Sequence, residues 1–226
     1  MLSFYKMFGS PTGVGALLAR QAALAKLRRP WFAGGTITVA SVGADHHYLA
    51  SGSAAFEDGT LNFIGVPAVG LGLDLLDRLG MECIHQRVSA LTHWLVDQLA
   101  DLRHSSGRPL VRIYGPVGPE GARGGTVAVN FHDADDHQVI ERRAAERRIS
   151  IRGGCFCNPG AGEVALGLTS GEMSACFARS TARLAYDEFR RCIDGKSSGA
   201  VRVSVGLAST FADVQAFLDF ARTFLA

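Results

Sequence analysis

The sequence predicts a mixed α/β protein, and three patterns support this prediction. Segments rich in Leu, Val and Ala alternate with glycine-containing turns along the chain. Ala200–Gly206 alternates apolar and polar residues, as a half-buried strand does. Glu82–His104 instead carries apolar residues at intervals of three and four, the spacing of one helical face. A chain of 226 residues with both periodicities is long enough to bury a sizeable core.

The first half of the chain is predicted to alternate strands and helices. Phe8–Gly15 is a glycine-rich turn that follows Lys6 almost directly. A later apolar segment ends at Gly80, a residue suited to the C-terminus of a helix. The predicted elements are a strand over Val14–Leu18, a helix over Gln21–Leu27, a strand over Ile37–Val42 and a helix over Phe63–Arg78.

A polar break at Ser105–Pro109 marks the predicted domain boundary, so that residues 1–105 and 106–226 form separate domains. The second domain is expected to be a small α+β domain with its sheet covered on one face. Thr210 and Asp213 have the spacing of a capping box at its last helix. Its expected elements are strands over Val111–Tyr114, Gly125–Phe131, Ile149–Arg152 and Ala200–Gly206, and helices over Asp135–Arg148, within Glu163–Gly195 (two, with a break near Ser170) and over Thr210–Leu225.

Composition and charge exclude several classes of protein. The formal net charge of +2 gives no reason to expect a nucleic-acid partner or an anionic membrane. No apolar run reaches membrane-spanning length, and the N-terminus lacks the pattern of a signal peptide. The odd count of five cysteines predicts reduced thiols of a cytoplasmic protein rather than a disulfide framework. The spacing of the histidines at 85, 93 and 104 predicts no metal site.

The most informative stretch is Ser150–Gly160, SIRGGCFCNPG, which holds two cysteines one residue apart. Its glycines and Pro159 predict a turn after a short apolar approach. Arg152 precedes Cys155 and Cys157, and a nearby cation favours the thiolate, the nucleophilic form of a thiol. The alternative is a structural pair of small buried cysteines.

Three further residues have both a functional and a structural interpretation. Lys6 could form a Schiff base if it were held in a desolvated pocket, whereas most lysines near an N-terminus are solvated surface charges. Thr60 could cap the following helix or bind an anion at its N-terminus. Arg202 could bind a carboxylate through its two-pronged guanidinium group, or form a surface salt bridge.

Five ordered matches make the chain similar to a known family. They are SFYKMFGSPTGVGALL around Lys6, FAGGTI, FEDGTLNF, IRGGCFCNPG and GAVRVSVG. Together these motifs resemble the class V branch of fold-type I pyridoxal-phosphate-dependent transferases, the group of cysteine desulfurases and molybdenum-cofactor sulfurases. The resemblance spans nearly the whole chain. It implies the C-terminal part of such an α/β enzyme, with residues 1–105 as the residual part of the large cofactor-binding domain.

The resemblance implies a pyridoxal 5′-phosphate site in that first domain. Lys6 matches the lysine that carries the cofactor and shuttles protons. Ser3 matches a phosphate-binding serine. Thr60 matches a threonine that reaches the cofactor phosphate of the neighbouring subunit in the family's homodimer, with Gly34 and Gly35 in a loop beside it.

The resemblance also implies sulfur transfer from L-cysteine. Cys157 matches the loop cysteine that takes up sulfur as a persulfide, while Cys155 has no assigned role. Arg202, together with Arg152, is the expected binding site of the substrate carboxylate. The paired cysteines, and Tyr5 where many desulfurases carry histidine, are closer to the molybdenum-cofactor sulfurases. A protein or a cofactor is the expected sulfur acceptor.

The family's cofactor lysine lies deep within its chains, whereas Lys6 lies near the start of this sequence. The preceding segment supplies most cofactor contacts in the family, so we expect weak or no cofactor binding by this chain alone. Two alternatives stay open. One is a class V aminotransferase or lyase acting on another amino acid, with Cys157 incidental. The other is a non-catalytic fragment or a subunit that completes another chain.

Overall fold

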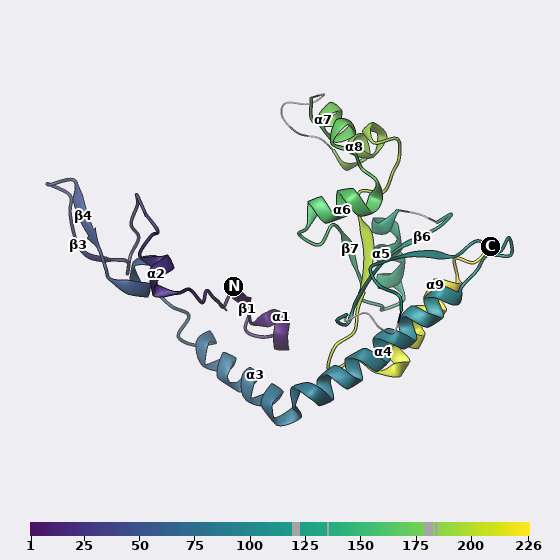
Figure 1. Cartoon of the computed structure of the whole chain (residues 1–226), viewed down its shortest axis with the longest axis horizontal. Coiled ribbons are helices and arrows are strands. Elements are labelled where there is room, and N and C mark those ends of the chain that lie inside the picture. The colour runs from purple at the N-terminus through teal and green to yellow at the C-terminus, as the bar shows by residue number, and fades with distance from the viewer. Residues whose placement is uncertain (119–122, 135, 179–182, 184) are drawn as a thin grey trace. The chain divides into compact units, whose positions relative to one another are not determined.

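The computed structural model describes residues 1–118, 123–134, 136–178, 183 and 185–226, and its contacts divide the chain into two compact units, Met1–Met81 and Glu82–Ala226 (Figure 1). The division lies earlier than the boundary predicted near residue 105. The reason is that the long helix before that boundary packs its buried leucines into the core of the second unit. Asp135, where a helix was predicted to begin, lies outside the described residues.

The first unit consists of short elements and one long helix. Two small antiparallel sheets form, β1 with β2 and β3 with β4. Strand β4 was not predicted, because its histidine-rich sequence has no buried apolar face. The elements are β1 (Leu2–Ser3), α1 (Tyr5–Phe8), β2 (Gly15–Ala16), α2 (Gln21–Leu24), β3 (Ile37–Ser41), β4 (His46–Leu49), the 3₁₀ helix η1 (Gly52–Phe56) and α3 (Gly65–Leu79).

The second unit is a four-stranded antiparallel sheet with helices, in the strand order β5-β6-β8-β7. The two strands nearest the cysteines, β7 and β8, therefore lie side by side at one edge. Strand β7 begins at Arg152, where the strand predicted over Ile149–Arg152 was expected to end. The elements are α4 (Met81–Asp101), β5 (Val111–Tyr114), β6 (Thr126–Phe131), α5 (His137–Glu146), β7 (Arg152–Gly154), α6 (Pro159–Leu166), α7 (Ser170–Ala178), α8 (Tyr186–Cys192), β8 (Ala200–Ser204) and α9 (Phe211–Arg222).

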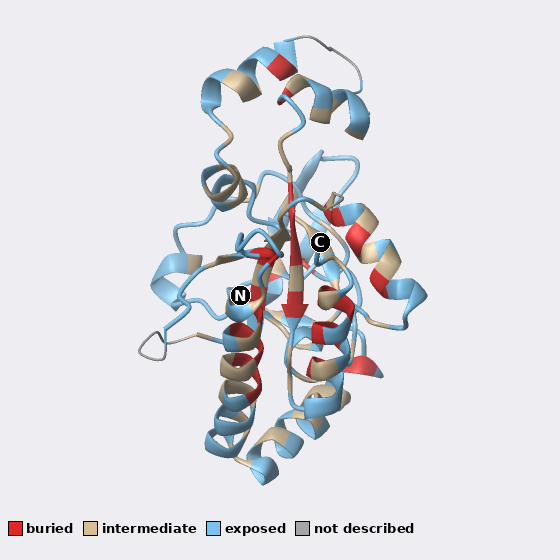
Figure 2. Cartoon of the chain, turned by 90° about the vertical axis from the view of Figure 1, so that its right-hand side faces the viewer, coloured by how far each residue is buried: buried red, intermediate tan, exposed pale blue. Residues whose placement is uncertain are grey.

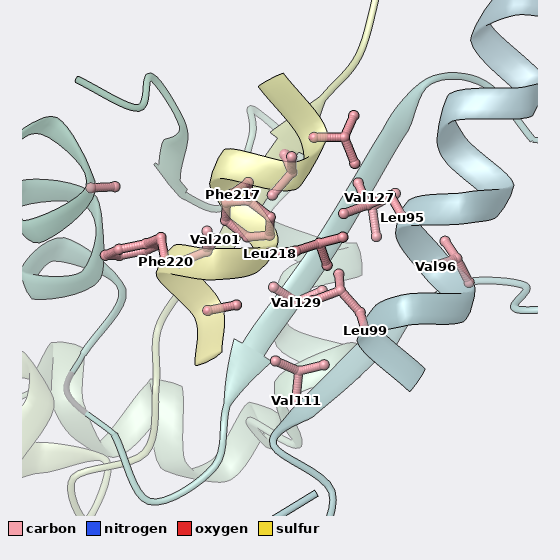
Figure 3. Close-up of a cluster of buried hydrophobic side chains, with 14 of the residues drawn as sticks. Leu95, Val96, Leu99, Val111, Val127, Val129, Val201, Phe217, Leu218 and Phe220 are labelled. Carbon is pink, nitrogen blue, oxygen red and sulfur yellow. The ribbon is translucent and has the colours of Figure 1, made fainter. Parts of the chain in front are cut away.

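One face of this sheet forms the hydrophobic core, as predicted. Val127 and Val129 of β6 are fully buried, and Val201 of β8 is 1% exposed. In Figure 3 these side chains lie with leucines of α4 and with Phe217 and Leu218 of α9. Figure 2 shows the same pattern along the chain, with buried residues gathered on one side of each long helix of this unit. Burying these valines commits the alternate residues of β6 and β8 to the opposite face.

Local signals set the ends of two helices. The predicted capping box of α9 is confirmed, because the Thr210 hydroxyl accepts from the Asp213 amide and the Asp213 carboxylate accepts from the Thr210 amide. Helix α6 begins earlier than predicted, at Pro159, with the Asn158 side chain accepting from the Ala161 amide. Asparagine as cap with proline in the first turn is a common start signal, which the sequence analysis interpreted only as a turn.

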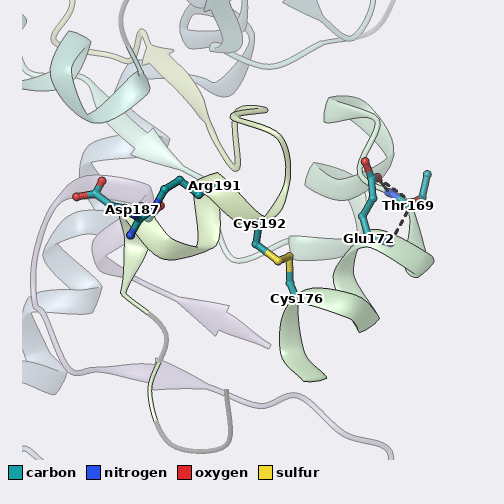
Figure 4. Close-up of a disulfide and its surroundings, with 6 residues drawn as sticks. All are labelled: Thr169, Glu172, Cys176, Asp187, Arg191 and Cys192. Carbon is teal, nitrogen blue, oxygen red and sulfur yellow. Dashed lines mark hydrogen bonds between the residues drawn. A yellow bond between two sulfur atoms is a disulfide. The ribbon is translucent and has the colours of Figure 1, made fainter. Parts of the chain in front are cut away.

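The connection from α6 to β8 contains a disulfide between Cys176 of α7 and Cys192 of α8 (Figure 4). The prediction of reduced thiols was therefore wrong for this pair. The two helices bring the Cα atoms to 5.7 Å, within the range that a disulfide bridges. A sequence separation of 16 residues gave no sign of this proximity. The other cysteines, at positions 83, 155 and 157, are free and exposed.

Glu172 at the start of α7 provides a pH-dependent contact. Its carboxylate accepts hydrogen bonds from the Lys196 ammonium and from the Thr169 amide and hydroxyl. These hydrogen bonds lower the pKa of Glu172 from 4.5 to about 2, and the bond from Lys196 has the largest effect. The pKa of Glu172 is thus lower in the folded chain than in the unfolded chain. The stability that this contact contributes is therefore fully present above about pH 4.5 and is lost as the pH falls through about 2.

We expect an NMR titration of the Glu172 carboxyl carbon to give a pKa near 2, and the Lys196→Met variant to raise it towards 4.5. The shift should shrink at high salt because the pair is partly exposed. Lys26→Met removes an exposed lysine of the first unit and serves as the control, with no expected change. An ordinary titration of Glu172 in the unsubstituted chain would contradict this interpretation.

Candidate functional site

The two cysteines of the loop lie in a tight turn that leaves β7. The Asn158 amide donates to the Cys155 carbonyl at 3.0 Å, which closes a four-residue β-turn. Both central residues have positive φ, +55° at Phe156 and +59° at Cys157. For residues other than glycine, this left-handed conformation costs about 1–2 kcal/mol per residue. Such strain is characteristic of functional loops, and here it presents both thiols at the surface.

The open face of the sheet carries a row of four residues straight across its strands. Tyr114 of β5 is paired with Ala128 of β6, Ala128 with Arg202 of β8, and Arg202 with Arg152 of β7. Directly opposite residues of antiparallel strands project to the same face. The alternation predicted for β8 is thus confirmed, with its valines in the core and Arg202 on the other side.

Arg152 and Arg202 form a concentration of positive charge on neighbouring strands. Neither arginine has an ion-pair partner among the described residues. The alternative interpretation of Arg202, a surface salt bridge, is therefore excluded for the described part of the chain. The Arg202 Nε is buried and without a hydrogen-bond acceptor. Like charges directly opposite destabilise a sheet, and a buried donor without a partner adds a further cost. A bound carboxylate would relieve both.

Arg202 opens onto a pocket of about 370 Å³, within the usual size range of small-molecule sites. The Arg202 guanidinium lies 5.0 Å from the centre of the Phe156 ring. Cys155 lines this pocket, whereas Cys157, the predicted nucleophile, does not belong to its wall. The wall consists of Tyr114, Thr126 and Ala128 from β5 and β6, Gly154–Phe156 and Asn158 from the turn, Ala161, Gly162, Ala165 and Leu166 from α6, and Gly199, Ala200 and Arg202 from β8.

Tyr114, Phe156 and Asn158 line the pocket, although no sequence pattern indicated them as site residues. Burial raises the pKa of Tyr114, although the nearby Arg112 opposes this shift. Tyr114 therefore presents a neutral hydroxyl on the same row as the arginines. Only strand pairing revealed it, because 88 positions separate it from Arg202 in the sequence.

The strand pair β7–β8 is supported from behind by a buried histidine. The His137 Nδ1 lies 3.2 Å from the Asp136 carboxylate, and both side chains are about 5% exposed. The Tyr186 hydroxyl donates to the same carboxylate and accepts from Ser198, just ahead of β8. Burial is the main cause that raises the pKa of Tyr186, so its hydroxyl stays protonated. Among the described residues this polar network joins α5, α8 and the approach to β8.

The first unit holds the residues proposed for a cofactor. Ser3 lies at the end of β1, and Lys6 is exposed in the four-residue helix α1, rather than in a desolvated pocket. The Lys6 ammonium lies 5.7 Å from the centre of the Tyr5 ring. No described residue accepts a hydrogen bond from it, and the Ser3 hydroxyl is likewise unpaired within the described chain.

Thr60 lies beside the loop of Gly34 and Gly35, because the Gly59 amide donates to the Gly34 carbonyl at 2.8 Å. Gly35 has φ +85°, and a side chain there would approach the Gly59 carbonyl to 3.1 Å. Thr60 does not cap α3, since the Gly65 amide bonds to Asn62 instead. Its exposed hydroxyl has no partner within the described residues. A lysine amine can hold an aldehyde and a free hydroxyl can donate to a phosphate, so each of these groups has chemistry that suits a phosphorylated aldehyde.

No group of three or more His, Cys, Asp or Glu side chains in the described part of the chain could hold a metal ion. No helix of that part of the chain is both long enough and apolar enough to cross a membrane.

Comparisons with known proteins agree on one family. The family model described as aminotransferase class V matches residues 1–217. The molybdenum cofactor sulfurase of Bos taurus is 38% identical over 97% of this chain and 26% of its own length, and that of Drosophila melanogaster is 40% identical over 98% and 30%. The chain thus spans less than a third of these relatives.

Solved structures support the fold. A cysteine desulfurase from Thermococcus onnurineus matches with a TM-score of 0.69 and 21% identity, over 99% of this chain and 46% of that one. The cysteine desulfurase from Escherichia coli, in its S-sulfonic acid form, matches with a TM-score of 0.67 and 18% identity over the same shares.

Gly199→Ala is expected to destabilise the strand pair β7–β8, because the added methyl group would collide with Gly154 and with the His137 ring. The new Cβ atom would lie 2.8 Å from the Gly154 Cα and 2.8 Å from the His137 Cε1, so the strand pair or the ring must move. Overpacking of this kind costs about 1–3 kcal/mol. Urea unfolding followed by circular dichroism would measure the loss.

Gly160→Ala provides the matched control, because nothing lies within 4 Å of its Cβ position in α6. Alanine favours a helix over glycine, so this variant should be neutral or slightly more stable. Equal stability of the two variants would show that β7, β8 and His137 are not closely packed.

Proposed function

The chain belongs to the aminotransferase class V family, and we propose that it takes part in pyridoxal-phosphate-dependent sulfur transfer from L-cysteine through a persulfide on Cys157. The observation that carries this proposal is the unpaired Arg152–Arg202 couple beside a strained turn with two exposed thiols. An aminotransferase acting on another amino acid needs the arginines but not the thiols. The molybdenum cofactor sulfurases and cysteine desulfurases similar to this chain support the choice of sulfur chemistry.

Arg202 and Arg152 bind the carboxylate of the amino acid in this proposal. A guanidinium group matches a carboxylate with two parallel hydrogen bonds, and the unpaired Arg202 Nε is one donor that needs an acceptor. The pocket beside Arg202 is walled by Tyr114, Phe156 and Leu166 together with several glycines and alanines, and it has room for a small amino acid such as cysteine. Binding at the arginines would orient the substrate sulfur towards the turn.

Pyridoxal 5′-phosphate is the proposed cofactor, and the unpaired groups of the first unit support it. Lys6 would hold its aldehyde group and Ser3 its phosphate. Thr60, with the Gly34–Gly35 loop beside it, would reach the cofactor phosphate of the neighbouring subunit. When bound, the cofactor withdraws electrons from the α-carbon of the amino acid. The Lys6 amine would move a proton to and from that carbon.

Cys157 is the proposed sulfur acceptor. Its thiolate attacks the sulfur atom of the substrate, a new sulfur–sulfur bond forms, and the carbon–sulfur bond breaks. The carbon side retains the electron pair, takes up a proton and leaves as alanine. Cys157 then carries a persulfide for an acceptor protein or cofactor. The exposed position of this thiol is consistent with delivery to a large acceptor.

A homodimer and a cytoplasmic location complete the proposal. Helix α3 exposes a series of apolar side chains, including Leu71 at 71%, and exposed apolar surface of this kind is commonly covered by further protein. Three free thiols favour a reducing compartment, with the Cys176–Cys192 pair as the exception. We expect neither a nucleic acid nor a membrane as partner, and only weak binding of the cofactor by this chain alone.

Chemical trapping at Lys6 tests the cofactor site even when binding is weak. The chain has three lysines, Lys6, Lys26 and Lys196. After incubation with pyridoxal phosphate and reduction with borohydride, mass spectrometry should find the phosphopyridoxyl group mainly on Lys6. Lys26 is exposed as well and serves as the internal control. Equal labelling of Lys6 and Lys26 would contradict the proposed site.

Sulfur loading from L-cysteine tests the function itself. At saturating pyridoxal phosphate, we expect alanine in solution together with sulfur taken from L-cysteine, counted as protein-bound sulfane sulfur plus free hydrosulfide. All are lost in Cys157→Ala, whereas Cys155→Ala still forms alanine and holds its sulfur as sulfane sulfur. Cyanolysis measures the sulfane sulfur, bimane trapping measures the hydrosulfide, and peptide mass spectrometry locates the bound sulfur. Loss of loading only in Cys155→Ala would show that the assignment within the pair is wrong. Transamination of other amino acids without sulfur loading would instead favour the aminotransferase alternative.

A further inference from the structure

We propose that Cys155 is a resolving thiol that attacks the persulfide of Cys157 and releases its sulfur as hydrosulfide, an inference that rests on the proposed persulfide at Cys157. The second thiol of the loop would then decide the form in which sulfur leaves the protein. Three features of the turn carry the inference: the spacing of the two cysteines, the different surroundings of their side chains and the chemistry of a dithiol.

The turn keeps the two thiols within bonding reach. Consecutive Cα atoms are about 3.8 Å apart, so residues i and i+2 of a tight turn have Cα atoms roughly 5–6 Å apart. Disulfides bridge Cα separations of about 4.4–6.8 Å. The hydrogen bond from the Asn158 amide to the Cys155 carbonyl holds the chain in this bend. The backbone spacing of the turn is therefore compatible with a bond between Cys155 and Cys157.

The two thiols have different surroundings. Cys155 follows β7 directly and lines the pocket that contains Arg202, while Cys157 lies one residue further on, outside the wall of that pocket. A persulfide on Cys157 thus has a reduced thiol next to it, on the side of the arginines. Both cysteines are exposed, so water can solvate the leaving hydrosulfide and an external reductant can reach the product.

The step balances without a further reagent. The Cys155 thiolate attacks Sγ of Cys157, the Sγ–Sγ bond forms, and the bond from Sγ to the outer sulfur breaks. The outer sulfur leaves with the electron pair as HS⁻. That sulfur is reduced from the sulfane to the sulfide level, while the two cysteine thiols are oxidised to a disulfide. An external dithiol then reduces the exposed disulfide and restores both thiols for another cycle.

Loading with inorganic polysulfide tests this step independently of the cofactor. The reduced 226-residue chain is treated briefly with sodium tetrasulfide, desalted and followed by bimane trapping of sulfide and by peptide mass spectrometry. We expect hydrosulfide release without added reductant, together with a Cys155–Cys157 disulfide. In Cys155→Ser the persulfide should stay on Cys157, with release slowed by about tenfold or more because the intramolecular attack is lost.

Cys83→Ser is the matched control, since it removes an exposed free thiol of α4 outside the loop and should release hydrosulfide like the unsubstituted chain. Equal release from Cys155→Ser, or release without a Cys155–Cys157 disulfide, would overturn the inference. A persulfide that accumulates on Cys155 would overturn it too. If polysulfide loading gives the expected pattern but L-cysteine with pyridoxal phosphate loads no sulfur, the proposed function fails while the resolving role of Cys155 stands.

Discussion

The burial of valines on one face of the second unit's sheet is the constraint on which the candidate site depends. Val201 and Val203 of β8 pack under the helices, so the residue between them must project to the other side. That residue is Arg202, and strand pairing then places Arg152 directly opposite it. The free energy of the apolar core thereby holds two like charges together, a position that electrostatics alone would disfavour.

Close packing at glycine positions extends this arrangement to the thiols. Gly153 and Gly199 leave room for the His137 ring behind β7 and β8, where any side chain would collide with it. With the strand pair supported, β7 can end in the strained turn that carries Cys155 and Cys157. The backbone strain of the turn is tolerated because hydrogen bonds and the packed sheet hold both of its ends. One face of the sheet thus provides stability, and the other carries the candidate site.

Sequence periodicity predicted regular elements well and irregular ones poorly. β5 was predicted at its observed bounds, and the capping box at Thr210 marked the start of α9, because these signals are local. Strand β4 and the start of α6 were missed, since one lacks an apolar face and the other begins at an Asn-Pro pair that also fits a turn. Of the two interpretations of Thr60, the structure excludes the helix cap, because the Gly65 amide at the start of α3 donates to Asn62 instead.

The sequence by itself determined the period-two pattern of β8, the glycine turn with its two cysteines and the family motifs that contain Lys6 and Arg202. Such features depend on neighbouring residues and survive without knowledge of distant contacts. Only the tertiary structure decided that Arg152 lies opposite Arg202, that Tyr114 joins their row and that Cys155 rather than Cys157 lines the pocket. It also decided the pairing of Cys176 with Cys192. These relations arise from strand register and helix packing, which bring together residues that no local pattern connects.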